Sequence, residues 1–297
     1  MSVPGPVGDD YRRYVLSLGC RDDTGIVARI TTFIAELGGS IVEAGYHADA
    51  DSGWFFTRQA VRASSITIPV DELRNRFSDV AATLGPETDW RLHDTGVPKR
   101  VVLLVSREAH CLHDLLGRAS GGELPATIEA VIGNHADLGP VARAHGVEFH
   151  HVPFPRDPAE RGPAFEKVRG LVDAHNPHAV VLARFMQVLP ASLCDHWAGR
   201  AINIHHSFLP SFVGAKPYHQ AFARGVKLIG ATCHYVTAEL DAGPIIEQDV
   251  IRVDHADEVR DMVRQGRDIE KLVLARGLRW HLEDRVLVHG RKTVVFS

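Results

Sequence analysis

The sequence lacks paired cysteines, and their absence excludes two kinds of small stabilised domain. Its four cysteines, Cys20, Cys111, Cys194 and Cys233, are scattered without a Cys-x-x-Cys pair. Neither a zinc knuckle nor a disulfide framework is therefore expected. The sequence also lacks an apolar run of membrane-spanning length, and residues 1–10 lack the basic region and apolar core of a signal peptide. We expect a cytoplasmic protein with no membrane partner.

Long blocks of like charge are also missing. The formal net charge of -4 is spread along the chain, so a nucleic-acid partner is not expected. The 18 histidines include no His-Glu-x-x-His motif. His110 and His113 share one face of a predicted helix, but we predict no carboxylate or thiolate beside them as a third ligand, since Asp114 points elsewhere. We expect neither a metal nor a cofactor.

The length and apolar content are sufficient for two domains. The chain has 297 residues, of which 45% are hydrophobic. Periodicity in the first part predicts strands at 14–19, 40–47, 54–61 and near Trp90, with helices at 26–37 and 70–84. This β-α-β-β-α-β order is typical of a ferredoxin-like α+β module. We assign residues 1–12 to an N-terminal tail, 13–94 to this domain and 95–99 to a linker.

The pattern changes after the linker, and it predicts a second, α/β domain over residues 100–297. Short apolar runs alternate with helical segments, which indicates a mainly parallel sheet of Rossmann-like type. The predicted strands are 101–105, 130–132, 149–152, 179–182 and 201–204, followed by a long helix at 268–282 and a hairpin at 286–296. Ligands of such sheets bind at the carboxyl ends of the strands.

Asn203, His205 and Asp241 form the most informative polar pattern. Residues alternate faces along a strand, so the side chains of Asn203 and His205 leave the same face. Asp241 precedes a Gly-Pro turn that follows a predicted strand at 230–236, and such a turn can hold its carboxylate against that face. Two donors and a carboxylate suit an acyl-transfer site that opens a formyl amide. The alternative is that Asn203 and His205 are hydrogen-bonded loop residues near a strand end, without a chemical role.

Longer motifs around these residues carry a resemblance to a known family. The runs 203–218, 234–236 and 240–246 resemble the formyltetrahydrofolate-dependent hydrolases and transferases, and within them the deformylases. The similarity extends through residues 225–232 and covers nearly the whole chain. The resemblance implies that residues 100–297 form a formyltransferase-like catalytic domain.

The first domain is similar to the ACT regulatory domain that members of this family carry. The similarity rests on residues 25–28 at the start of the first helix and on Phe55-Phe56 in a strand. It implies an amino-acid effector, for which Asp22, Asp23 and Gly25 are the candidate binding residues. The alternative is that the two aspartates only cap the first helix.

The resemblance implies that water, rather than an amine, accepts the formyl group. Family members that act on glycinamide ribonucleotide have a glycine-rich phosphate loop in the first strand-to-helix turn of the catalytic domain. Here residues 106–111 contain no glycine, and Glu108 would repel a phosphate. Gly133-Asn134-His135 and the doubled His205-His206 are also similar to the deformylases.

We assign each catalytic residue a role in this hydrolysis. Asn203 donates to the formyl oxygen, and His205 donates as a cation and passes a proton to the leaving nitrogen. Asp241 orients the water, and it either accepts its proton or keeps His205 charged. The predicted folate-binding residues are Arg184, Phe185, Met186, Val188, Leu189, His234, Val236 and Leu240.

Several of these assignments have structural alternatives. The loop 184–189 could be buried, Arg184 could be an ion-paired residue, and His234 could be explained by strand packing alone. His206 is expected to face away from His205 and to be a packed histidine.

The implied function is hydrolysis of 10-formyltetrahydrofolate to formate and tetrahydrofolate. This reaction would supply formate for purine synthesis and balance the one-carbon folate pools, under regulation by the ACT domain. Family resemblance also implies a homo-oligomer, either a tetramer or a hexamer. Two alternatives are a formyltransferase with an amine acceptor and a noncatalytic sensor of folate and an amino acid.

Overall fold

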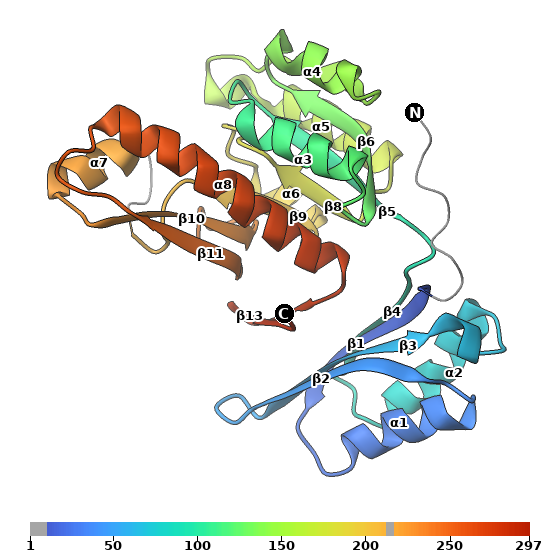
Figure 1. The fold of residues 1–297 in the computed structure, drawn as a ribbon. Helices are drawn as coiled ribbons and strands as arrows, with labels where there is room; N and C mark the ends of the chain where they lie inside the picture. Colours follow the sequence, from blue (N-terminus) through green and yellow to red (C-terminus); the bar gives the residue numbers. More distant parts are fainter. Residues whose placement is uncertain (1–10, 212–216) are drawn as a thin grey trace. The chain divides into compact units, whose positions relative to one another are not determined.

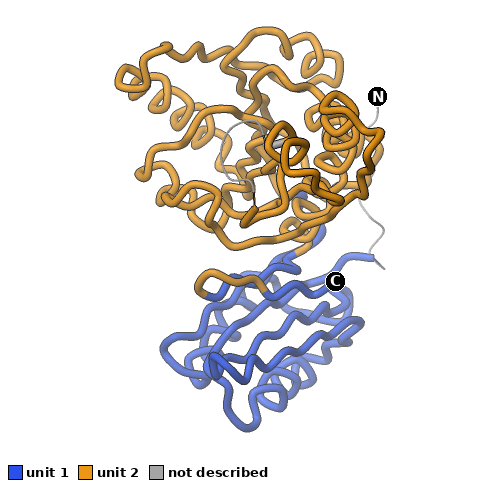
Figure 2. Tube along the Cα trace, turned by 90° about the vertical axis from the view of Figure 1, so that its left-hand side faces the viewer, with its two compact units in different colours: residues 1–98, 284–289, 294–297 blue, residues 99–283, 290–293 orange. Residues whose placement is uncertain are grey.

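Two compact units make up the chain (Figure 2). The computed structural model describes residues 11–211 and 217–297, so most of the predicted N-terminal tail and residues 212–216 of the run 203–218 lie outside the described residues. Unit 1 contains residues 1–98, 284–289 and 294–297, and unit 2 contains residues 99–283 and 290–293. The last residues of the predicted second domain therefore group with unit 1.

Unit 1 has the β-α-β-β-α-β order expected from its sequence. Its elements are β1 (Arg13–Arg21), α1 (Ile26–Glu36), β2 (Ile41–Asp49), β3 (Trp54–Arg62), the 3₁₀ helix η1 (Ala63–Ser65), α2 (Val70–Ala82), β4 (Asp89–Asp94) and, from the C-terminal part, β12 (Val286–His289). The first four strands form an antiparallel sheet in the order β2-β3-β1-β4. β12 pairs with β13 (Lys292–Val295), which confirms the closing hairpin.

The core of unit 1 lies between its sheet and its two helices. Ile26, Ile30 and Ile34 recur every four residues along α1 and pack against alternate residues of β1 such as Leu18. Gly25, at φ 85°, precedes α1 in the left-handed conformation that glycine adopts without steric cost. Burial of this apolar face, rather than helix propensity, therefore stabilises α1.

Unit 2 is built on a larger, mainly parallel sheet, as predicted. Its elements are β5 (Lys99–Val105), α3 (His110–Ser120), β6 (Ala126–Gly133), η2 (Ala136–Leu138), α4 (Gly139–Ala144), β7 (Glu148–His151), η3 (Pro158–Glu160), α5 (Gly162–Ala174), β8 (Ala179–Leu182), α6 (Ala191–His196), β9 (Ala201–His205), α7 (Pro217–Arg224), β10 (Leu228–Tyr235), β11 (Ile245–Arg252) and α8 (Val259–Leu282). The strand order over the described residues is β11-β10-β9-β8-β5-β6-β7. β10 and β11 run antiparallel to their neighbours, and the sequence patterns did not predict β11.

Helices cover both faces of this sheet (Figure 1). α5 and α6 pack on one face through an apolar cluster that includes Val168, Leu193 and Trp197, while α3 and α8 lie on the other. In the part of the chain that is described, no helix is long and apolar enough to cross a membrane.

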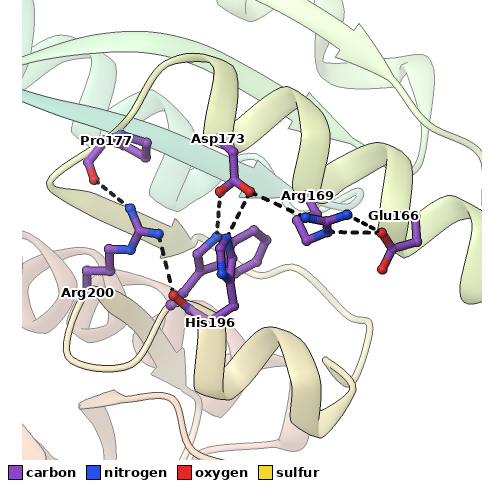
Figure 3. Close-up of polar contacts among 7 residues, drawn as sticks. Glu166, Arg169, Asp173, Pro177, His196 and Arg200 are labelled. Atoms are coloured by element: carbon purple, nitrogen blue, oxygen red, sulfur yellow. Dashed lines mark hydrogen bonds and ion pairs between the residues drawn. The ribbon is translucent and has the colours of Figure 1, made fainter.

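A polar cluster ties α6 to α5 (Figure 3). The carboxylate of Asp173, near the end of α5, accepts hydrogen bonds from His196 Nε2 at 2.8 Å and from Trp197 Nε1 at 3.2 Å. Arg200 donates to the carbonyl oxygens of Pro177 and His196. Because α6 directly follows the loop 184–189, this cluster fixes the far end of that loop.

α8 and β10 lie so close together at Gly277 that this position requires a residue without a side chain, and the requirement can be tested. A Cβ atom at this position would lie 2.5 Å from the buried Cys233 Sγ. We predict that Gly277→Ala lowers the free energy of unfolding by roughly 1–3 kcal/mol, as overpacking usually does, measured by urea denaturation.

Gly170, in the exposed part of α5, is the matched control, because a Cβ there meets nothing within 4 Å. Gly170→Ala should instead stabilise the protein by about 0.5–1 kcal/mol. Adding Cys233→Ala to Gly277→Ala should recover part of the loss. Equal effects of the two glycine substitutions would contradict this account.

Candidate active site

The candidate site lies where the parallel strands of unit 2 end. Asn203 and His205 are on β9, and β10 runs antiparallel beside it. In this register the Cα partner of Asn203 is His234 and that of His205 is Thr232. Strand pairing therefore adds a second histidine to the predicted group.

Asp241 reaches the same place through the turn that follows β10. Its backbone is left-handed, at φ 55°, a conformation that Asp adopts more readily than most residues. The turn folds back closely, because a Cβ at Gly243 would lie 1.8 Å from the Tyr235 carbonyl oxygen. The Tyr235 N–H in turn donates to the carbonyl of Pro244 at 2.9 Å. Glycine is thus required for Asp241 to approach the strand ends.

The carboxylate of Asp241 contacts His205 directly. Asp241 Oδ1 lies 3.3 Å from His205 Nδ1 and 3.8 Å from His234 Nε2, and all three side chains are at least nine-tenths buried. Burial alone would raise the pKa of the Asp241 carboxyl, but the hydrogen bond and charge of His205 outweigh it and lower that pKa. Asp241 is therefore ionised at neutral pH, and His205 Nε2 is the ring nitrogen left without a hydrogen-bond partner among the described residues.

His234 links Asn203 to this pair and determines the orientation of its amide. His234 Nδ1 lies 2.8 Å from the Tyr235 carbonyl oxygen, which can only accept, so Nδ1 carries the proton. The other nitrogen, Nε2, must then accept from Asn203 Nδ2 at 3.2 Å. Burial lowers the pKa of His234, which keeps the ring neutral. One N–H of the Asn203 amide is thereby used, and the second remains for a ligand.

The predicted folate loop after β8 divides into buried and exposed residues. Phe185 and Leu189 belong to the apolar core of unit 2. Met186 and Val188 are 56% and 65% exposed, which leaves them free to contact a flat apolar ligand. The Met186 N–H donates to Ser106 Oγ at 2.9 Å and so fastens the loop to the end of β5.

The other predicted folate-binding residues differ in exposure. Leu240 is 55% exposed, whereas Val236 is half-buried against the same core. His234 is buried, with both ring nitrogens engaged by the protein. The described contacts show no ligand role for His234, and folate binding by it stays a prediction.

Several buried polar atoms near these strand ends have no hydrogen-bond partner among the described residues. Buried polar groups are normally paired, so a concentration of unpaired ones favours a site that a polar ligand or water completes. They are His110 Nδ1, Asn134 Oδ1, Gln187 Oε1 and His205 Nε2.

The structure also reveals a cluster that the sequence patterns missed. Glu270 on α8 lies 2.8 Å from His110 Nε2, although 160 residues separate the two in sequence. The ligand-type atoms of His110, Cys111 and Glu270 all lie within 4.8 Å of one another. The prediction that no carboxylate or thiolate stands beside His110 was therefore wrong. The available signal was an acidic residue on the otherwise apolar, buried face of α8.

The candidate effector residues lie in unit 1, between β1 and α1, and are exposed. Asp23 accepts a hydrogen bond from the Thr24 N–H, and its Oδ2 lies 3.7 Å from the guanidinium of Arg29. The cap residue of α1 is Gly25, which has no side chain to bond. The interpretation of the two aspartates as caps of this helix was therefore wrong.

Comparisons with known proteins agree over most of the chain. Residues 99–278 match the formyl transferase family model. Formyltetrahydrofolate deformylases from Corynebacterium sp. and Mycobacterium bovis are 44% and 47% identical over 95% of this chain, and the matches cover 98% and 90% of those proteins. A crystal structure of a formyltetrahydrofolate deformylase from Pseudomonas syringae aligns with a TM-score of 0.93 at 56% identity, covering 96% of this chain and 95% of that one. The chain belongs to the formyltetrahydrofolate deformylase family.

Proposed function

We propose that this chain hydrolyses 10-formyltetrahydrofolate to formate and tetrahydrofolate. The observation that carries the proposal is the contact of 3.3 Å between Asp241 Oδ1 and His205 Nδ1, beside an Asn203 amide whose orientation is determined by His234. These groups supply a carboxylate, an imidazole and an amide donor at one point, and together they can act as base, acid and oxyanion donor in formyl hydrolysis.

Each group has a distinct part in the proposed reaction. The free N–H of Asn203 donates to the formyl oxygen and stabilises the negative charge that develops there. Asp241 orients a water and takes its proton as the water oxygen bonds to the formyl carbon. His205 acts as a cation and gives the proton on its otherwise unpaired Nε2 to the N10 nitrogen as the carbon–nitrogen bond breaks, and the proton that Asp241 took from water then restores the cation. Formate and tetrahydrofolate are then released.

Charges at the start of α3 support water as the acceptor. His110, in the first turn, lies 2.8 Å from Glu270 and 3.9 Å from Glu108. Glu108 also pairs with Arg267 at 2.7 Å and Glu270 with Arg184 at 3.5 Å, so these carboxylates compete with a phosphate for the cations near this helix N-terminus. This arrangement disfavours a phosphorylated amine as the acceptor.

The wider role is part of the same proposal. We assign the reaction to the supply of formate for purine synthesis and to the balance of one-carbon folate pools, in the cytoplasm of the cell. Unit 1, whose β-α-β-β-α-β order suits an ACT domain, would bind an amino-acid effector at Asp22, Asp23 and Gly25. Assembly into a homo-oligomer, tetramer or hexamer, belongs to this proposal as well.

The decisive experiment measures formate released from 10-formyltetrahydrofolate by the purified protein with no amine present. We predict release by the wild type and a large loss in Asp241→Asn, because a neutral amide cannot accept the proton of water. Release that requires an added amine would identify a formyltransferase. Folate binding without any turnover would identify a sensor instead.

Removal of the Asn203 donor gives a second prediction. Asn203→Ala should lower kcat by about two to three orders of magnitude, since one oxyanion donor contributes roughly 2.7–4 kcal/mol. His234→Phe keeps a ring in the same space but cannot accept from Asn203, so it should lower kcat to a smaller degree. Steady-state kinetics checks both, and wild-type turnover in Asn203→Ala would remove Asn203 from the mechanism.

His206 gives a prediction about stability and pH. Burial and the nearby charges of Arg184 and His205 lower its pKa to about 4, against the opposite effects of Glu270 and Asp241. Its ring centre lies 5.3 Å from that of His205. Below pH 6.5 His206 binds a proton in the unfolded state, whereas in the folded state it binds one only near pH 4. The free energy of unfolding therefore falls as the pH drops toward 4. His206 is therefore neutral at pH 7 and unsuited to donate a proton.

We expect wild-type protein to lose about 2 kcal/mol of unfolding free energy through His206 between pH 7 and pH 5. His206→Gln should lack this part of the loss, which urea denaturation at the two pH values would show. Identical losses in the two proteins would contradict the assignment.

A further inference from the structure

Among the described residues, Glu270 carries the most deeply buried carboxylate, and it takes no direct part in the proposed reaction. Its side chain is 1% exposed. One oxygen accepts from His110 Nε2 at 2.8 Å and lies 3.5 Å from Arg184 Nε, and the other accepts from the Tyr218 hydroxyl at 2.8 Å. Glu270 therefore joins α8 to the first turn of α3, to the loop after β8 and to α7.

The group is charged despite its burial. Burial by itself raises the pKa of the carboxyl, but the hydrogen bonds from His110 and Tyr218 and the charge of Arg184 outweigh it, and the pKa falls below its usual value. An isolated buried carboxylate would cost several kcal/mol, so the ion depends on all of these partners.

The chain makes room for this arrangement at Gly266, one turn before Glu270. A Cβ atom there would lie 1.9 Å from the Tyr218 hydroxyl oxygen. Tyr218 can thus lie across α8 only because residue 266 has no side chain. The hydroxyl then reaches the carboxylate, and burial together with Glu270 raises the phenol pKa, which keeps the hydroxyl a donor.

A metal ion is a poor occupant for this cluster, although His110, Cys111 and Glu270 are close enough to share one. The guanidinium of Arg184 already supplies a positive charge beside Glu270. Burial raises the pKa of the Cys111 thiol well above its usual value, so the sulfur is not available as a thiolate. Arg184 is the better partner for the carboxylate.

Arg184 is the partner that connects the cluster to the candidate site. Its backbone is left-handed, at φ 65°, which for a residue with a long side chain costs on the order of 1–2 kcal/mol and persists only where surrounding contacts hold it. Its side chain is 13% exposed and faces Glu270. The exposed residues Met186 and Val188 follow within four positions.

We propose that Glu270 is a positioning residue for folate binding, which acts by holding Arg184 and so sets the course of the loop 184–189. The proposal rests on the function proposed above. Glu270 touches none of Asn203, His205 and Asp241, so its loss should weaken substrate binding and leave the chemical step nearly intact. A purely structural role would instead lower stability and turnover together.

The first test is Glu270→Gln, which keeps the size of the side chain and removes its charge. We expect KM for 10-formyltetrahydrofolate to rise roughly tenfold or more, since displacement of a positioned loop is costly, while kcat changes by less than about threefold. Glu247→Gln is the matched control, because Glu247 is a partly buried carboxylate against α8, 3.9 Å from the guanidinium of Arg276. Glu247→Gln should have the KM and kcat of the wild type. An unchanged KM in Glu270→Gln would overturn the proposal.

The second test asks whether Glu270 acts through Arg184. Arg184→Gln should raise KM by itself, and the double variant should show a KM no higher than that of Arg184→Gln. If the increase in KM of the double variant equalled the product of the two single-variant increases, the proposal would be overturned. Circular dichroism would show whether Glu270→Gln folds. If it does not, Arg184→Gln is the deciding variant, and an unchanged KM in Arg184→Gln would overturn the proposal.

Failure of the proposed function would be distinct from failure of this inference. If wild type released no formate, binding of tetrahydrofolate by equilibrium dialysis would replace KM in every comparison. Weaker binding by Glu270→Gln, but not by Glu247→Gln, is the expected result. Equal binding by all three proteins would overturn the role of Glu270.

Discussion

The antiparallel pairing of β10 with β9 is the constraint on which the candidate site depends. The strands β5 to β9 run parallel to one another, and their ends alone would bring together only residues of those five strands. The reversed strand places His234 opposite Asn203 and lets the following turn return Asp241 to His205. A carboxylate, an amide and two imidazoles thus meet through one strand pair.

Two buried carboxylates in unit 2 have different surroundings. Asp241 faces histidines, and its hydrogen bond to His205 leaves part of its capacity to accept unused. Glu270 is surrounded by three donors on three separate segments. The first arrangement suits a group that exchanges protons during a reaction, and the second suits a permanent charge that organises its neighbours.

Much of the fold follows from local sequence patterns, but the full site does not. Alternation along β9 was enough to place Asn203 and His205 on one face, and the apolar periodicity of α1 predicted its buried stripe. Glu270 could not be paired with His110 from sequence, because that contact depends on how α8 crosses the sheet. The sequence also could not predict which residues of the loop 184–189 are buried, since Phe185 and Met186 are both apolar and only packing decides which one is buried.

The tautomer of His234 has a further consequence for the site. Its proton is directed to the carbonyl oxygen of Tyr235, an atom of the main chain that neither titrates nor changes when a side chain is replaced. Donation therefore runs in one sense only, from the Asn203 amide through the ring to the backbone. The direction of this hydrogen-bond chain is thus set by a main-chain carbonyl group, and it would persist in any variant that keeps His234 and preserves the course of β10.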